Sequence, residues 1–348
     1  MKIKFILAIF LLLSAIVGCA EKDSLSIVND DFYIVDSYQI LMLCESDEAD
    51  IKYIELLPQL KGNGGEVKAT IESLSVLRDS IETKNALGVA YIRLREYDKA
   101  LEVLEIALED VQTEEQRVCI FTNLAAVKSL NGFHEEAYEL LLLAEQSEVN
   151  SPVKQLVLES NLHRANVQQK KSAVQEIAAV KQLLKKEQQL LGQNQFIGIY
   201  NYVTLGLACF EDDQYKKSKE YMNIAIELND DLYQYKFVTA ELNRMLAEIN
   251  MNYKDDVDAA FICINKSIEI LENWEEKEHP ELINMYLSRS RMYYSINQEE
   301  NALRDIQVAL SRSKPMHDLA AVSYFNIGWI HYEKYRDALA IDNLAKAY

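Results

Sequence analysis

The sequence predicts an all-α fold in which pairs of antiparallel helices repeat along the chain and stack into a solenoid. Ten glycines and four prolines are few for 348 residues, and this scarcity favours long helices with short connections over a turn-rich β fold. Hydrophobic residues make up 49% of the chain, which is enough to bury a large core. Small side chains return at intervals of 36 to 45 residues, at Ala100, Ala137, Ala173, Ser218, Ala260, Ala302 and Ala340.

The first clear repeat shows why small residues return. Gly88 and Ala100 leave room for two antiparallel helices to approach closely, and Leu104 fills the space beside that contact. Gly206 and Gly328 occupy the position of Gly88 in later repeats. The pattern resembles the tetratricopeptide repeat, whose period is about 34 residues. The residues that carry the resemblance in this repeat are Leu87, Gly88, Tyr91, Tyr97, Ala100, Leu104 and Ala107.

We expect about six to seven helical hairpins in residues 83–348 and an atypical helical cap in residues 31–82. The cap has apolar residues at helical spacing, among them Tyr33, Ile34 and Leu41, but it lacks the repeat signature. A terminal unit of this kind covers the apolar edge that the first repeat would otherwise expose.

Residues 1–18 are typical of an export signal. Two lysines precede an apolar run that is shorter than the roughly 20 residues needed to span a bilayer as a helix. The run ends Ile16-Val17-Gly18-Cys19, which resembles the bacterial lipobox. An ordinary signal peptide, or a core helix that contains a cysteine by chance, is the alternative interpretation.

The lipobox resemblance implies cleavage before Cys19, a diacylglycerol on its thiol and acylation of the new amine. Two or more acyl chains hold a protein stably at a membrane, whereas a single chain holds it weakly. Residues 19–30 would then form a polar tether. The resemblance therefore implies a lipid-anchored protein of the cell envelope, at the periplasmic or the surface face of the outer membrane.

The charge and the missing motifs exclude several kinds of function. The net charge of −19 argues against nucleic acid as a partner, because phosphates are repelled by a strongly negative surface. The sequence lacks the phosphate loop GxxxxGK followed by Ser or Thr, the dinucleotide motif GxGxxG and the zinc motif HExxH. Ser151 begins an S-x-x-K match without its companion motifs, so we interpret it as a helix cap. We expect no catalytic residue, metal site, cofactor or small-molecule substrate.

The tetratricopeptide resemblance further implies a concave groove, lined by the first helix of each repeat, that takes an extended or helical peptide. The Lys and Asn residues of the family's carboxylate clamp are absent from the matching positions, which are largely apolar or aromatic. Such a groove suits a partly apolar peptide or a partner helix; alternatively, these rings pack within the solenoid. The groove residues are Tyr200, Leu207 and Phe210, then Leu287, Arg291 and Tyr294, and finally Phe325, Trp329 and Tyr332.

Together these features predict a non-catalytic protein–protein interaction scaffold that is anchored to the bacterial cell envelope through Cys19 and binds a protein or peptide partner there. The alternative is the periplasmic sensor portion of a longer tetratricopeptide signalling or transcription-regulating protein. That alternative rests on the position of Tyr348, which directly follows the second helix of a repeat without a polar capping helix. An enzyme is the third possibility, and no residue is a candidate for its chemistry.

Overall fold

The structure is a computed structural model. It describes residues 33–35, 39–45, 51–192, 196–230, 236–252, 256–275, 279–313 and 317–348. Sixteen α-helices, one 3₁₀ helix and two short strands are present within them. The predicted signal peptide, the lipidation of Cys19 and the tether over residues 19–30 lie outside the described residues.

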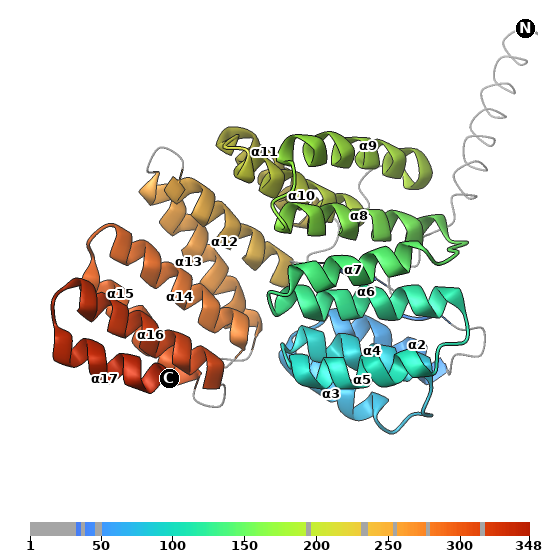
Figure 1. The fold of residues 1–348 in the computed structure, drawn as a ribbon, viewed down its shortest axis with the longest axis horizontal. Helices are drawn as coiled ribbons and strands as arrows, with labels where there is room; N and C mark the ends of the chain where they lie inside the picture. The colour runs from blue at the N-terminus through green and yellow to red at the C-terminus, as the bar shows by residue number, and fades with distance from the viewer. Residues whose placement is uncertain are drawn as a thin grey trace, which may run out of the picture.

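Fourteen of the described helices form seven antiparallel hairpins, which confirms the predicted α-solenoid of six to seven hairpins (Figure 1). In each hairpin two consecutive helices pack against each other along their length. The pairs are α4 (Ile81–Arg93) with α5 (Tyr97–Glu109), α6 (Glu114–Leu130) with α7 (His134–Glu145), α8 (Pro152–Gln168) with α9 (Ala173–Leu191), α10 (Phe196–Glu211) with α11 (Tyr215–Leu228), α12 (Lys236–Asn252) with α13 (Val257–Trp274), α14 (Pro280–Ser295) with α15 (Glu299–Arg312), and α16 (His317–Glu333) with α17 (Asp337–Ala347).

The turn inside most hairpins contains one residue with a positive φ angle. This left-handed residue lies two or three positions before the second helix and lets the chain reverse direction. Because it recurs at the same place, it gives a structural register by which positions in different repeats can be compared. The residues are Arg95, Gly132, Lys170, Asp213, Asn297 and Tyr335.

The close-contact glycines lie where the repeat pattern predicts them. A Cβ atom added to Gly88 would meet Leu104 at 2.5 Å, and one added to Gly328 would meet Leu344 at 2.7 Å. Each glycine therefore faces the second helix of its own hairpin, and a larger residue would push the two helices apart.

The N-terminal cap is only partly helical. Its later part forms α2 (Ile51–Leu56), the 3₁₀ helix η2 (Leu57–Lys61) and α3 (Gly64–Leu74). Its first part forms an antiparallel pair of strands, β1 (Tyr33–Val35) and β2 (Ile40–Met42), so the helical prediction for these residues was wrong. A short, continuous apolar run is equally consistent with a helix and with a strand that is buried on both faces, and periodicity alone does not separate the two.

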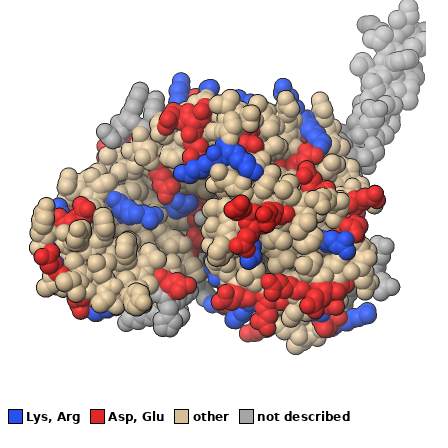
Figure 2. Space-filling model, in the orientation of Figure 1, with Lys and Arg blue, Asp and Glu red and all other residues tan. Residues whose placement is uncertain are grey.

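The hairpins are arranged in two lobes (Figure 1). One cluster of buried apolar side chains joins the strands and the helices up to α12, and a second cluster joins α12 to α16. The surface is hollowed between the lobes (Figure 2). Helix α12 contributes to both clusters and therefore couples the two halves of the solenoid.

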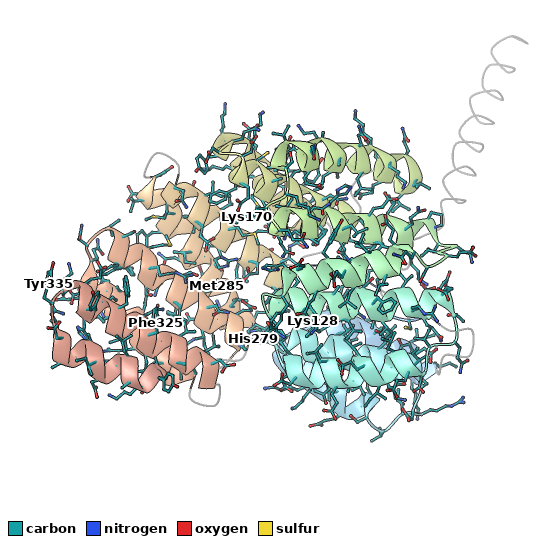
Figure 3. All side chains as sticks on the ribbon, in the orientation of Figure 1. Lys128, Lys170, His279, Met285, Phe325 and Tyr335 are labelled. Carbon is teal, nitrogen blue, oxygen red and sulfur yellow. The ribbon has the colours of Figure 1, made fainter. Side chains whose placement is uncertain are left out.

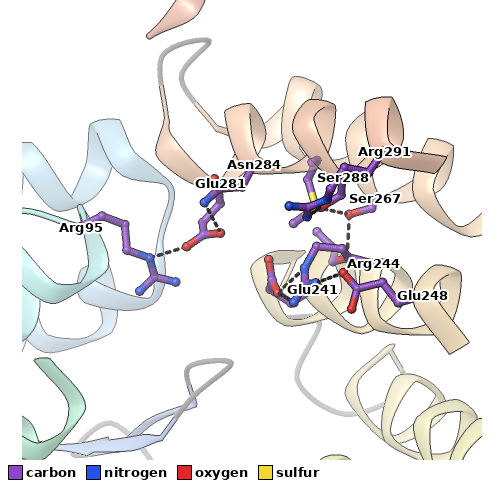
Figure 4. Close-up of polar contacts among 11 residues, drawn as sticks. Arg95, Glu241, Arg244, Glu248, Ser267, Glu281, Asn284, Ser288 and Arg291 are labelled. Carbon is purple, nitrogen blue, oxygen red and sulfur yellow. Dashed lines mark hydrogen bonds and ion pairs between the residues drawn. The ribbon is translucent and has the colours of Figure 1, made fainter. Parts of the chain in front are cut away.

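The lobes also meet where the turn of the first hairpin reaches the start of α14 (Figure 4). Arg95 donates from Nε to Oε1 of Glu281 at 2.6 Å, and the main-chain N–H of Gly64 donates to Oε2 of Glu275 at 2.8 Å. The guanidinium carbon of Arg95 also lies 5.0 Å from the ring centroid of Phe237 in α12. Residues more than 180 positions apart are thus joined by buried polar contacts.

Burial and the neighbouring charges determine the protonation states of His279 and Glu281 at this contact between the lobes. Burial lowers the pKa of His279 to about 4, which keeps its ring neutral, and its Nδ1 accepts from the N–H of Glu281 at 3.3 Å. Burial alone would raise the pKa of Glu281, but the charge of Arg95 holds that pKa below its ordinary value. At this contact the pair of Arg95 and Glu281 is therefore charged, and the neighbouring ring of His279 is neutral.

Candidate interaction surface

The inner face of the first lobe already holds an extended segment, which is the chain's own strand β2. Asn123 of α6 accepts from the N–H of Met42 at 3.0 Å and donates to its C=O at 2.7 Å. Asn161 of α8 accepts from the N–H of Ile40 at 2.9 Å and donates to its C=O at 2.9 Å. Each asparagine therefore binds both main-chain groups of a single strand residue.

The geometry of a strand explains this pairing. The N–H and C=O of one residue point to the same side of a strand, and alternate residues point to opposite sides. Ile40 and Met42 face the two asparagines, while β1 pairs with β2 along the other edge. Asn85 of α4 extends the network, because it donates to the C=O of Met42 at 2.9 Å and accepts from Asn123 at 2.7 Å. The asparagine side chains take the place of a third strand.

Sequence reasoning missed these asparagines, although the chain contains a signal for them. Asparagine is unfavourable inside a helix because its side chain competes with the main chain for hydrogen bonds. Asn85, Asn123 and Asn161 lie within helices and return every 38 residues. All three are fully buried, which requires partners for their amides.

The strand segment packs closely on this part of the inner face. The side chains of residues 40–43 are fully buried, and the hydroxyl of Tyr53 donates to the C=O of Cys44 at 3.1 Å. Tyr33 stacks on Phe196 of α10 with ring centroids 5.2 Å apart. The chain itself thus fills the groove of the first repeats.

The predicted groove residues of α10 are covered to different extents. Tyr200 is 1% exposed, and the guanidinium carbon of Arg164 lies 5.2 Å from its ring centroid. Leu207 and Phe210 are half-buried and pack against the first apolar cluster. Phe210 also packs edge-on against Tyr215, with centroids 5.4 Å apart. None of the three forms an exposed apolar face.

The predicted groove residues of α14 do not form one apolar face either. Leu287 is buried in the second apolar cluster. Arg291 is exposed and donates to the hydroxyl of Ser288 at 3.1 Å, within its own helix (Figure 4). Tyr294 is half-buried, and Nζ of Lys334 lies 6.0 Å from its ring centroid.

Helix α16 presents the predicted aromatic row to solvent. Phe325, Trp329 and Tyr332 are 50%, 47% and 58% exposed, and Val322 continues the row one turn earlier. Steps of three or four residues place these side chains on one side of the helix. The ring centroids of Phe325 and Trp329 are 6.3 Å apart, and those of Trp329 and Tyr332 are 5.8 Å apart. Figure 3 labels Phe325 in the second lobe.

Asn326 directly follows Phe325 in α16 and lies beside the aromatic row. It is nine residues before the left-handed Tyr335, just as Asn123 and Asn161 are nine residues before Gly132 and Lys170. Asn326 therefore occupies the repeat position from which the other two asparagines bind β2. Its Nδ2 is buried and has no hydrogen-bond partner among the described residues.

We also considered metal ligands, thiols and membrane-spanning helices among the described residues. No three of their His, Cys, Asp or Glu side chains gather in a way that could hold a metal ion. Their cysteines are free thiols, of which Cys44, Cys119 and Cys209 are buried and Cys263 is half-buried. No helix in this part of the chain is long and apolar enough to span a bilayer.

Comparison with known proteins relates this chain to several solved structures. The structure of a Rap protein complexed with Competence and Sporulation Factor is similar with a TM-score of 0.62 and 11% identity, over 85% of this chain and 84% of that one. The structure of NprR in complex with its cognate peptide NprX is similar with a TM-score of 0.54 and 14% identity, over 84% and 85%. A chain of the Cut9–Hcn1 hetero-tetramer has a TM-score of 0.50 and 14% identity over 86% of this chain, which spans about half, 49%, of that chain.

No protein-family model matches the sequence, and no curated protein does. The helical hairpins, their close-contact glycines and the likeness to solved structures define the fold as a tetratricopeptide-like helical solenoid. Identities this low relate the chains by fold alone.

Proposed function

We propose that this chain is a non-catalytic interaction scaffold and that its partner binds the aromatic row on α16, defined by Val322, Phe325, Trp329 and Tyr332. The observation that carries the proposal is the exposure of four neighbouring apolar side chains on one helix face. Contiguous exposed apolar surface is uncommon on soluble proteins and marks binding sites. Tryptophan and tyrosine are also the side chains that contribute most often to binding energy.

The binding test compares two exposed apolar side chains. We expect Trp329→Ala to abolish specific crosslinking between the chain and an envelope protein. Ile262→Ala is the matched control, because Ile262 is 69% exposed on α13 and lies outside the row. Crosslinking in intact cells followed by mass spectrometry measures both. If the wild-type chain and Trp329→Ala recovered the same partner equally, the aromatic row on α16 would not be the binding site.

We also propose that lipidated Cys19 holds the scaffold at the cell envelope, on the periplasmic or surface face of the outer membrane. The support is the sequence pattern alone: a basic start, a short apolar run and the tetrapeptide that ends at Cys19. We expect metabolic labelling with an alkyne fatty acid to mark the wild-type chain and not Cys19→Ala, and we expect only the former to sediment with membranes. Membrane-bound but unlabelled wild-type chain would rule out the anchor.

A second candidate function is the sensor portion of a longer signalling or transcription-regulating protein. The likeness to NprR in complex with its cognate peptide and to a Rap protein complexed with its factor favours it, because each of these similar folds is bound to a peptide or factor. The exposed Leu339 and Ile341 on α17 would suit a further packed element. Sequencing the gene beyond Tyr348 tests this candidate, since it requires a reading frame that continues into a membrane span or an effector domain.

A further inference from the structure

We propose that Cys44 and Cys119 form a disulfide bond, which ties the segment directly after β2 to α6. The two thiols are the modification site, and the co-reactant is an external disulfide that accepts their two electrons. The inference rests on the proposed export of the chain to the cell envelope. Disulfides persist in oxidising compartments such as the bacterial periplasm, whereas thiols in the cytosol are kept reduced.

The place of the two thiols on the fold gives the first argument. Asn123 binds both main-chain groups of Met42, and Cys119 lies four residues before Asn123, on the same side of α6. Sγ of Cys119 donates at 3.8 Å to the carbonyl oxygen of Leu43, the residue directly before Cys44. The contact that holds β2 on α6 therefore also brings the next residues of the chain to Cys119.

The contact between the two side chains gives the second argument. The thiols of Cys44 and Cys119 are joined by a hydrogen bond, so the two sulfur atoms already meet as free thiols. Tyr53 holds the other side of Cys44, because its hydroxyl donates to the carbonyl oxygen of Cys44 at 3.1 Å. Two cysteines can be bridged without a large backbone movement only where their side chains approach each other, as they do here.

The bond forms by thiol–disulfide exchange. One cysteine gives its proton to solvent and attacks the external disulfide, which yields a mixed disulfide and releases one thiolate. The second cysteine gives up its proton, attacks the cysteine sulfur of the mixed disulfide and releases the other thiolate. Two cysteine thiols are thus oxidised to one disulfide, and one external disulfide is reduced to two thiols.

Burial determines when this exchange takes place. Cys44 and Cys119 are each 1% exposed, so an external disulfide does not reach either sulfur in the folded chain. The hydrogen bond with Cys119, together with burial, raises the pKa of the Cys44 thiol well above its ordinary value, and only a thiolate attacks a disulfide. The bond therefore forms during folding, before the segment is covered, and burial then shields it from reductants.

The bond would add a covalent link where the fold has only hydrogen bonds and packing. Leu43 and Cys119 are 76 positions apart, so a bond at the next residue closes a long loop. A disulfide that closes a long loop stabilises a protein chiefly by restricting its unfolded chain. Reduction should therefore lower the stability of the chain.

The test begins with the full chain isolated from its own cells, with free thiols alkylated in denaturant at lysis and no reductant added. Trypsin places Cys44 in residues 23–52 and Cys119 in residues 118–128. We expect mass spectrometry to find these two peptides linked, at their combined mass less two hydrogen atoms. Alkylation should be lost at both cysteines and retained at Cys209 and Cys263.

Urea unfolding with and without a phosphine reductant gives a second measurement. We expect the reductant to shift the unfolding midpoint of the wild-type chain to lower urea, and to leave that of Cys44→Ala unchanged because this variant has no bond to reduce. Cys209→Ala is the matched control, since Cys209 is equally buried and lies in α10. Its midpoint should shift as in the wild type. Comparing each chain with itself removes the effect of the substitution on the fold.

Fully alkylated Cys44 and Cys119 in the chain isolated from cells would overturn the inference, as would a bond from either of them to another cysteine. An equal shift of the midpoint in Cys44→Ala and in the wild type would overturn it as well. Fatty-acid labelling of Cys19 and crosslinking through Trp329 would still decide the proposed anchor and the proposed binding site.

Discussion

Asparagine inside a helix carries a donor and an acceptor that the helix itself does not use, so its position shows where the fold needs an outside partner. Asn123 and Asn161 find that partner in β2. The equivalent Asn326 has a buried Nδ2 that finds none among the described residues. The same side chain binds the strand at two repeat positions, and at the third its Nδ2 is left without an acceptor in the described part of the chain.

Glu187 leads to a prediction about pH at the scale of one residue. Burial raises its pKa to about 7, although Nδ2 of Asn201 donates to its carboxylate at 3.3 Å. Because the folded chain then binds more protons than the unfolded chain between about pH 4.5 and 7, this group lowers stability as pH rises through that window. We expect Glu187→Gln to stabilise the chain by up to about 3 kcal/mol at pH 8 and to lose most of that advantage at pH 5.

Urea unfolding of the wild type and of Glu187→Gln at both pH values measures this difference directly. Comparing the two chains cancels the contribution of His279, which has the opposite sign because its pKa is lowered to about 4. An equal free-energy difference at pH 5 and at pH 8 would contradict the assignment of a neutral carboxyl to buried Glu187.

At the scale of the element, the glycines show how the helices of each hairpin pack. An alanine at Gly88 would place its Cβ 2.5 Å from Cγ of Leu104, whereas one at Gly206 would meet the terminal Cε of Met222 at 2.7 Å. The branch point of Leu104 can move only by a change of its first side-chain torsion within the packed hairpin, whereas the end of Met222 can turn aside about later torsions and its Cγ, at 3.1 Å, needs to shift only slightly. Both substitutions gain helix propensity, but only Gly88→Ala adds a severe clash. Comparing their stabilities therefore distinguishes the cost of overpacking from the gain in helix propensity.

We expect Gly88→Ala to destabilise the chain by about 1–3 kcal/mol, because the clash exceeds the gain of about 1 kcal/mol in helix propensity. Gly206→Ala should be close to neutral, because the Met222 side chain yields. Thermal and urea unfolding of both variants measure the difference. A stabilised Gly88→Ala would mean that the two helices of the first hairpin are not in close contact.

The repeat array could be predicted because its cause is local in the sequence. Gly88 and Ala100 lie within one hairpin, so steric complementarity repeats with the hairpin and appears as a period in the residues. The strand β2 could not be predicted in this way. Its partners Asn123 and Asn161 lie 81 and 121 residues away, and only the assembled solenoid brings them together.

At the scale of the whole molecule, the contact between the lobes decides how open the solenoid is. The pair of Arg95 and Glu281 is almost fully buried, with side chains 2% and 11% exposed. Removing one partner of a buried pair leaves an uncompensated charge, at a cost of about 3–5 kcal/mol. We expect Glu281→Gln to separate the lobes and to raise the radius of gyration in small-angle X-ray scattering.

Glu299→Gln is the control for this change of shape. It breaks the pair of Arg336 and Glu299, whose arginine is 44% exposed and which lies away from the lobe contact. Partly exposed ion pairs contribute about 0–1 kcal/mol to the stability of a fold, so the radius of gyration should stay at the wild-type value. An unchanged scattering curve for Glu281→Gln as well would show that α12 alone sets the angle between the lobes.

The chain's own strand covers the inner face of the first lobe, and we propose that this leaves binding to α16. Hydrogen exchange at the main-chain amides of Ile40 and Met42 measures how firmly the strand is held, because both amides donate to asparagine side chains. We expect exchange as slow as in the core helices, accelerated at Ile40 by Asn161→Ala and unchanged by Asn326→Ala. If both amides of the wild-type chain exchanged at the rate of exposed residues, the strand would not cover the inner face.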